Sequence, residues 1–130
     1  MSEKPVIDAA TEKILSLENE TRFAPNGIVS RTLLRTDFSR VVLFGFSEGQ
    51  ELTEHTSTQF AVIQILSGEC EFSLAGKPQI VKAGEMIYMP PGVAHAVRAT
   101  KQFSMLLTLS KPVAKASEFS PAKLASFAVV

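Results

Sequence analysis

The stretch from Gly84 to His95 constrains the fold of this chain more than any other feature of the sequence. Gly84 marks a turn, Met86–Met89 is a short apolar strand, and Pro90-Pro91-Gly92 follows directly. Proline fixes φ and glycine permits positive φ, so these three residues form a stiff corner. The corner predicts that His95 opens the next strand with its side chain directed inward.

The rest of the central region has the pattern of an all-β protein. Short apolar or alternating runs are separated by closely spaced turn signals, which is typical of a sandwich or a barrel. Phe60–Leu66 is almost continuously apolar, which predicts a strand buried on both faces. The expected strands are Ile28–Thr36, Val41–Phe46, Leu52–Ser57, Phe60–Leu66, Cys70–Leu74, Gln79–Lys82, Met86–Met89, His95–Ala99 and Phe103–Leu109.

The two ends of the chain have weaker patterns. Asp8 is a candidate N-cap for a short helix over Ala9–Leu17, and a strand at Ile14–Leu17 is the alternative. The C-terminal segment favours a loop followed by a short helix over Ala122–Phe127. The apolar residues Phe127–Val130 predict that this end docks on the domain.

Composition limits the classes of function. The chain has 130 residues, the size of one domain, with 13 basic and 13 acidic side chains. A net charge of zero provides no excess positive charge for binding nucleic acid or an anionic membrane. Cys70 is the single cysteine, so a disulfide within the chain and a cysteine-rich zinc site are excluded. The polar N-terminus lacks a signal core, and a cytoplasmic protein is expected. Neutral charge with 45% apolar residues predicts a homodimer.

The second of two motif-like segments in the chain resembles the second motif of the cupin family. In that motif a glycine, a proline, a glycine and a histidine follow at fixed spacing, and Gly84, Pro90, Gly92 and His95 match them. Only the final asparagine departs, because Ala99 stands there. The resemblance implies an all-β double-stranded β-helix, the cupin jelly roll. It covers a barrel over 28–110, with an N-terminal extension over 1–27 packed on the barrel and a C-terminal tail over 111–130.

The first motif of that family is present only in part. Gly49, His55 and Gly68 match, whereas Ser57 stands in place of a second histidine and Ala61 in place of a glutamate. The resemblance therefore implies a metal site reduced to His55 and His95. Two imidazoles suit a divalent transition metal such as Zn, Fe, Ni or Cu but would hold it weakly. The sequence also resembles a subset of small cupins that keep one histidine in each motif.

Strand geometry extends this candidate site. Alternate residues of a strand share a face, so positions 55, 57, 59 and 61 are expected on one interior face. His95 is expected on a strand across the barrel from them. The candidate ligand-binding residues are His55, Gln59, Tyr88 and His95. A second group is assigned to other roles: Arg31, Arg35 and Arg40 to the surface, Arg35 and Arg98 as possible anion contacts at the barrel mouth, and Cys70 to the core.

Three functions are consistent with these observations. The first is a small cupin-domain protein that binds a small molecule in the barrel cavity without strong metal-dependent catalysis. The alternative is a metal-dependent enzyme of the dioxygenase or isomerase type that uses His55 and His95. The third is a structural dimeric β-module. The cupin scaffold hosts many unrelated chemistries, so fold analogy does not choose among them.

Overall fold

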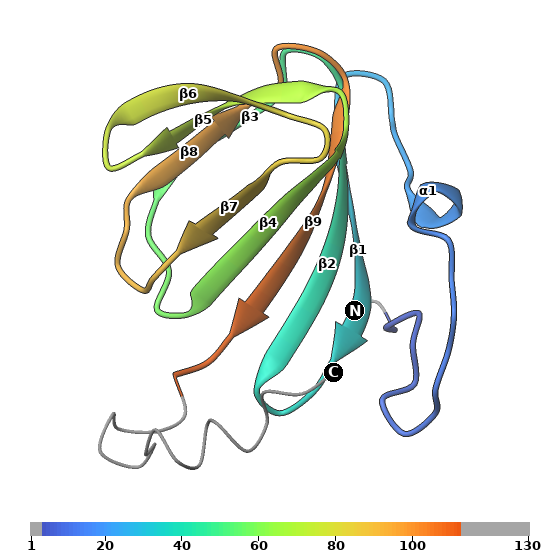
Figure 1. The fold of residues 1–130 in the computed structure, drawn as a ribbon. Coiled ribbons are helices and arrows are strands. Elements are labelled where there is room, and N and C mark those ends of the chain that lie inside the picture. The colour runs from blue at the N-terminus through green and yellow to red at the C-terminus, as the bar shows by residue number, and fades with distance from the viewer. Residues whose placement is uncertain (1–3, 113–130) are drawn as a thin grey trace.

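The computed structural model describes residues 4–112, which form two antiparallel sheets packed face to face (Figure 1). The five-stranded sheet has the order β1 (Ile28–Arg35), β2 (Ser39–Phe46), β9 (Phe103–Ser110), β4 (Phe60–Ser67) and β7 (Met86–Met89). The four-stranded sheet has the order β3 (Glu51–His55), β8 (His95–Arg98), β5 (Glu69–Leu74) and β6 (Lys77–Lys82). Among these residues no helix has the length and apolar character needed to span a membrane.

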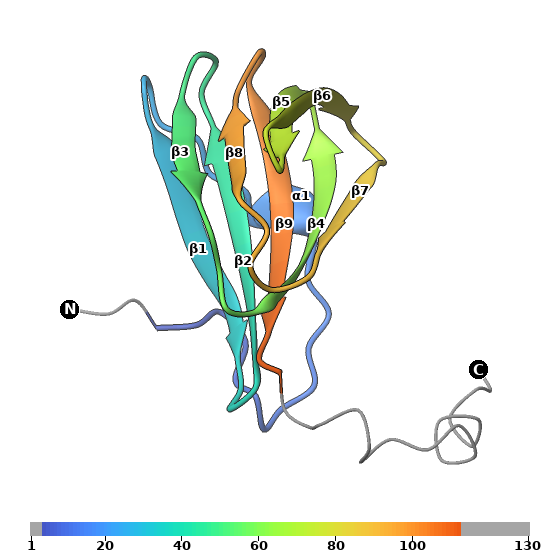
Figure 2. The same cartoon turned by 90° about the vertical axis from the view of Figure 1, so that its left-hand side faces the viewer.

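The expected set of strands is confirmed, and the all-β class with it. The chain crosses between the sheets after β2, β3, β4, β6, β7 and β8, and strands distant in sequence therefore become neighbours (Figure 2). β9, for example, lies between β2 and β4 along its whole length. This order gives the double-stranded β-helix that the motifs imply.

The core lies between the two inner sheet faces. Phe46 and Phe103 are fully buried and stack with ring centroids 4.5 Å apart, and Phe72 faces them from the other sheet. Cys70 is also fully buried. Burial, and to a smaller extent charge repulsion from Glu69, raises the pKa of its thiol to about 12. The thiol therefore stays protonated and acts as a small core hydrophobe, as the sequence predicted.

The interpretation of Phe60–Leu66 as buried on both faces was wrong. Inward-facing Ala61, Ile63 and Ile65 are buried, whereas the outward-facing positions between them are half-buried or exposed. Phe60 is 38% exposed on this outer face. Alternating burial is the normal pattern of an antiparallel strand with one face on the core, and here most outer positions, Phe60, Val62 and Leu66, also carry apolar side chains.

The segment over residues 4–27 lies against the outside of the five-stranded sheet. Val6 and Ile7 donate their N–H groups to the carbonyls of Thr32 and Leu33, and so pair with the edge strand β1. Gly45 in β2 has no side chain because a Cβ there would overlap the Arg22 carbonyl oxygen. The segment and the sheet therefore approach each other at backbone contact.

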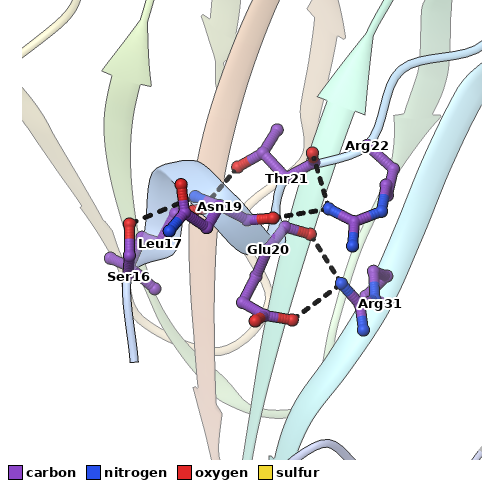
Figure 3. Close-up of polar contacts among 7 residues, drawn as sticks. All are labelled: Ser16, Leu17, Asn19, Glu20, Thr21, Arg22 and Arg31. Atoms are coloured by element: carbon purple, nitrogen blue, oxygen red, sulfur yellow. Dashed lines mark hydrogen bonds and ion pairs between the residues drawn. The ribbon is translucent and has the colours of Figure 1, made fainter. Parts of the chain in front are cut away.

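The helix predicted at Ala9–Leu17 is absent, and a single turn of helix, α1 (Leu17–Glu20), forms instead. The Asp8 carboxylate accepts from the Ala10 N–H, and the Asp8 carbonyl accepts from the Thr11 N–H. These bonds close a turn and do not begin a helix. Ser16 is the N-cap, since its hydroxyl accepts from the Asn19 N–H at 3.2 Å (Figure 3). The alternative strand at Ile14–Leu17 is absent too, and the helix predicted at Ala122–Phe127 and the docking of Phe127–Val130 lie outside the described residues.

One ion pair fastens α1 to the sheet. The Arg31 guanidinium of β1 donates to both the carboxylate and the backbone carbonyl of Glu20, each at 2.8 Å (Figure 3). Both side chains are about three-quarters buried, so this contact is better shielded from solvent than an ordinary surface pair. The N-terminal segment is therefore held at the β1 edge, at the Gly45 contact, by the Arg31–Glu20 pair and by hydrogen bonds from Ser47 to the Ala24 and Gly27 carbonyls.

Candidate functional site

A cavity of about 480 Å³ lies between the two sheets, which is within the size range of small-molecule sites. Its walls are mostly apolar and come from both sheets. Polar side chains gather on one side, in the β3–β4 connection and at the starts of β2 and β8. The apolar lining includes Phe44, Ile63, Phe72, Met89, Met105 and Leu107, and the polar lining includes Arg40, His55, Ser57, Gln59 and His95.

His55 and His95 meet as a cross-strand pair. His55 ends β3, His95 begins β8, and the two residues are partners in the register of these strands. Their ring centroids are 4.2 Å apart and the rings are tilted by 59°. The structure thus brings both predicted histidines to one cavity. The strand of His95 is the direct neighbour of β3, however, and the prediction that it lies across the barrel was wrong.

Two loops at one end of the barrel deliver these histidines. The β3–β4 and β7–β8 connections lie side by side at the end of the barrel where β9 also ends (Figures 1 and 2). The Gly92 N–H donates to the Ser57 carbonyl at 2.8 Å and ties the loops together. Gly92 has φ of +89°, as the Pro-Pro-Gly corner predicted. The corner thereby places His95 at the cavity.

The hydrogen bonds of the two imidazoles show which nitrogen is engaged by the backbone and which is left for a ligand. Nδ1 of His55 lies 2.8 Å from the Thr53 carbonyl, and Nδ1 of His95 lies 2.9 Å from the Val93 carbonyl. A carbonyl oxygen only accepts, so each Nδ1 carries the proton. In the neutral rings each Nε2 therefore keeps a free lone pair. The pair offers two nitrogen acceptors, held in orientation by the backbone.

The aromatic floor of the cavity supports this pair. The His95 ring lies parallel to Phe72, with an interplanar angle of 1° and centroids 6.2 Å apart. Phe72 is buried, His95 is half-buried and His55 is exposed. The imidazoles therefore stand between the apolar interior and solvent, where a ligand would present its polar end.

Gln59 also lines this cavity, together with Ser57 and Ala61. The predicted alternation within a single strand is not the cause, because β3 ends at His55 and a loop carries residues 56–59. In that loop the Ser57 hydroxyl accepts from the Gln59 N–H at 3.1 Å. The residues share the cavity because the loop turns inward at its edge.

Tyr88 does not belong to this site. Its neighbours Ile87 and Met89 face the interior, so the alternation of β7 turns Tyr88 to the outer face, where it is 52% exposed. It lines a separate shallow surface hollow with Ile80 and Met86. The prediction failed because β7 was too short and uniformly apolar for its sequence to reveal which residues face inward.

Arg40 is exposed, as predicted, and it also borders the cavity. It is the second residue of β2 and shares the alternation of Phe44 and Phe46, which face the interior. Arg98, by contrast, pairs with Glu71 at 3.6 Å and does not line the cavity. The sequence signal that could have placed Arg40 at the cavity was its even-numbered spacing from Phe44 and Phe46 in the same strand.

The side chains present fit a tightly bound metal poorly. Catalytic zinc sites use three protein ligands, and this cavity offers two imidazoles, with Ser57 and Ala61 at the remaining positions of the motif. Within residues 4–112, no group of three or more His, Cys, Asp or Glu side chains lies together. A metal held here would depend on the two Nε2 atoms and on ligands from solvent or substrate.

Comparison with known proteins identifies the family. The family model for the cupin domain matches residues 42–109, slightly more than half of the chain. The chain belongs to the cupin family. This cupin is 35% identical to a conserved protein of unknown function from Streptococcus pyogenes, with a TM-score of 0.74 over 88% of this chain and 98% of the other. No curated protein matches its sequence.

Two further structures share the barrel. This cupin is 33% identical to a conserved cupin barrel domain protein from Leptotrichia buccalis, with a TM-score of 0.71 over 75% of this chain and 47% of the other. It is 27% identical to an RmlC-like cupin from Desulfovibrio desulfuricans, with a TM-score of 0.70 over 79% and 100%. The family rests on the family model and the Streptococcus pyogenes relative, and the names of these two further structures state no ligand or reaction.

Proposed function

We propose that this cupin binds a small organic molecule in the cavity between its sheets. One observation carries the proposal: a cavity of about 480 Å³ has an apolar body and a polar side, where two imidazoles present free Nε2 atoms. Binding sites of this kind combine apolar walls with a few placed polar groups. The imidazoles accept hydrogen bonds from donor groups on the ligand, and the interior takes up its apolar part.

Substitution of the paired histidines tests this function. In the variants His55→Ala and His95→Ala, a ligand found by thermal-shift screening should bind about tenfold more weakly, because one hydrogen bond is lost. The control Tyr88→Ala removes a large side chain outside the cavity and should leave affinity unchanged. Isothermal titration calorimetry measures all three. Equal affinity in wild type and both histidine variants would contradict the proposed anchor.

A second candidate function is a metal-dependent enzyme of the dioxygenase or isomerase type. Its support is the orientation of His55 and His95, because ligating histidines commonly donate their other N–H to a backbone carbonyl. Elemental analysis of protein purified without tag or chelator separates the two functions. One equivalent of a transition metal, lost in His55→Ala or His95→Ala, would favour the enzyme. Its absence together with retained ligand binding would favour the binding protein.

Homodimer formation stays a prediction, and the outer face of β4 and β7 is our proposed interface. Phe60, Met86 and Tyr88 are 38%, 63% and 52% exposed on this face. They lie near one another because Val62 and Gln64 of β4 pair with Tyr88 and Met86. The variant Tyr88→Glu with Met86→Glu should convert a dimer to a monomer in light scattering. A wild-type protein that is monomeric at micromolar concentration would refute it.

A further inference from the structure

Among the residues that the structure describes, Arg40 is the one Asp, Glu, Lys or Arg side chain that lines the cavity. Within residues 4–112 its guanidinium forms no ion pair, whereas Arg31, Arg98 and Lys101 each pair with a glutamate. Arg40 is exposed at the edge of the apolar space, and an unpaired guanidinium there can bind a carboxylate strongly, because its planar fork binds both oxygens.

The surroundings of Arg40 add to its positive charge. Arg40 and Gln59 also line a hollow of about 380 Å³ at the β1–β2 turn, which adjoins the cavity through these two residues. Arg35 and Lys111 line that hollow as well, and Asp37 is its one carboxylate. This hollow, which we call the mouth of the cavity, therefore carries three positive side chains and one negative side chain, on a chain whose net charge is zero.

The apolar interior limits what kind of anion fits. Arg40 sits at the start of β2, and its register partner Leu109 lies beside it on the cavity wall. Beyond them the wall is formed by Phe44, Met105 and Leu107, with no further charge. A compact, highly charged anion such as a phosphate would leave this apolar wall uncovered. A carboxylate with an apolar chain matches both parts of the site.

We infer that the cavity selects a small amphipathic carboxylate, whose carboxylate group binds Arg40 at the mouth and whose apolar body lies between the sheets. The inference rests on the proposed binding function and names its ligand class. Arg35 and Lys111 attract the anion from solution without contacting it in the bound state, and this attraction weakens with salt. The histidine pair lies on the polar side of the cavity and accepts hydrogen bonds from donor groups on the ligand.

The test compares three eight-carbon probes that differ only in their polar end: octanoate, octanamide and octanol. Calorimetry at neutral pH should give octanoate at least tenfold higher affinity than octanamide. Arg40→Gln should abolish this preference, because the amide side chain keeps hydrogen-bonding capacity but not charge. Arg98→Gln changes the net charge equally at an outer site and should preserve the preference. Thermal unfolding confirms that both variants are folded.

Each outcome separates this inference from the function on which it rests. Equal binding of octanoate and octanamide to the wild type would overturn the carboxylate class and leave the binding function standing. A preference that survives Arg40→Gln but falls in Arg35→Gln with Lys111→Gln would move the anion site out of the cavity, and so overturn the assignment to Arg40. Binding of none of the three probes, with a panel of unrelated small molecules also failing, would overturn both.

Discussion

Replacement of Gly68 by alanine is expected to destabilise the domain more than any other single methyl addition in the turns. Gly68 joins β4 to β5 with φ of +70°, at the point where the chain passes from one sheet to the other. A Cβ there would overlap the Gln102 carbonyl oxygen and lie 2.9 Å from the Phe103 Cβ. Backbone strain and overlap together should lower the free energy of unfolding by about 3–5 kcal/mol.

Gly76→Ala is the matched control for this prediction. Gly76 also has a positive φ, of +80°, but a Cβ there would meet no atom within 4 Å. Gly76→Ala should therefore lower the free energy of unfolding only by the cost of placing an alanine at a positive φ, about 1–2 kcal/mol. Chemical denaturation of the two variants measures the difference. If both variants lost the same stability, the close approach between the β4–β5 crossing and β9 would be refuted.

Filling the cavity from Ala61 is expected to abolish ligand binding without loss of stability. Ala61 faces inward from β4, and its register partners Met89 and Leu109 also line the cavity. In Ala61→Leu the added carbons enter space that a ligand would occupy. Because the ligand is then sterically excluded, affinity should fall by about 100-fold or more. The free energy of unfolding should stay constant or rise, because apolar contacts are gained.

The neighbouring residue provides the control and the contrary outcome. Val62→Leu adds one methylene on the opposite face of the same strand and should leave affinity unchanged. In a well-packed interior Ala61→Leu would instead cost about 1–3 kcal/mol through overpacking. Such a loss, measured by denaturant unfolding, would show that the interior at Ala61 has no room for a ligand.

The sequence predicted the strands and the meeting of the two histidines, because both depend on local signals. Turn residues separate the strands, and the Pro90-Pro91-Gly92 corner with its spacing to His95 is a short-range pattern. His55 pairs with His95 because β3 and β8 are neighbours in the four-stranded sheet, and this order results from the crossing of the chain between the sheets. No short segment contains that information, and His95 was therefore predicted on a strand across the barrel.

The error at Tyr88 and the missed place of Arg40 at the cavity edge have one physical cause. Whether a side chain faces the interior depends on the register of its strand, and register is fixed by pairing with distant segments. A one-residue shift exchanges the two faces of β7, so its sequence alone was consistent with Tyr88 inside. Arg40 is at the surface as predicted, and only the register of β2 against β9 shows that it also borders the cavity.

Ligand contact within the barrel can be observed directly through the methionine methyl groups. Met89 and Met105 line the cavity, whereas Met86 lies 63% exposed on the outer face. Protein labelled with ¹³C at the methionine methyls would be titrated with a panel of small acids, amides, alcohols and sugars, octanoate among them. We expect saturable shifts of the Met89 and Met105 signals with at least one compound class, and a constant Met86 signal. Shifts confined to Met86, or none with any compound, would contradict the binding function.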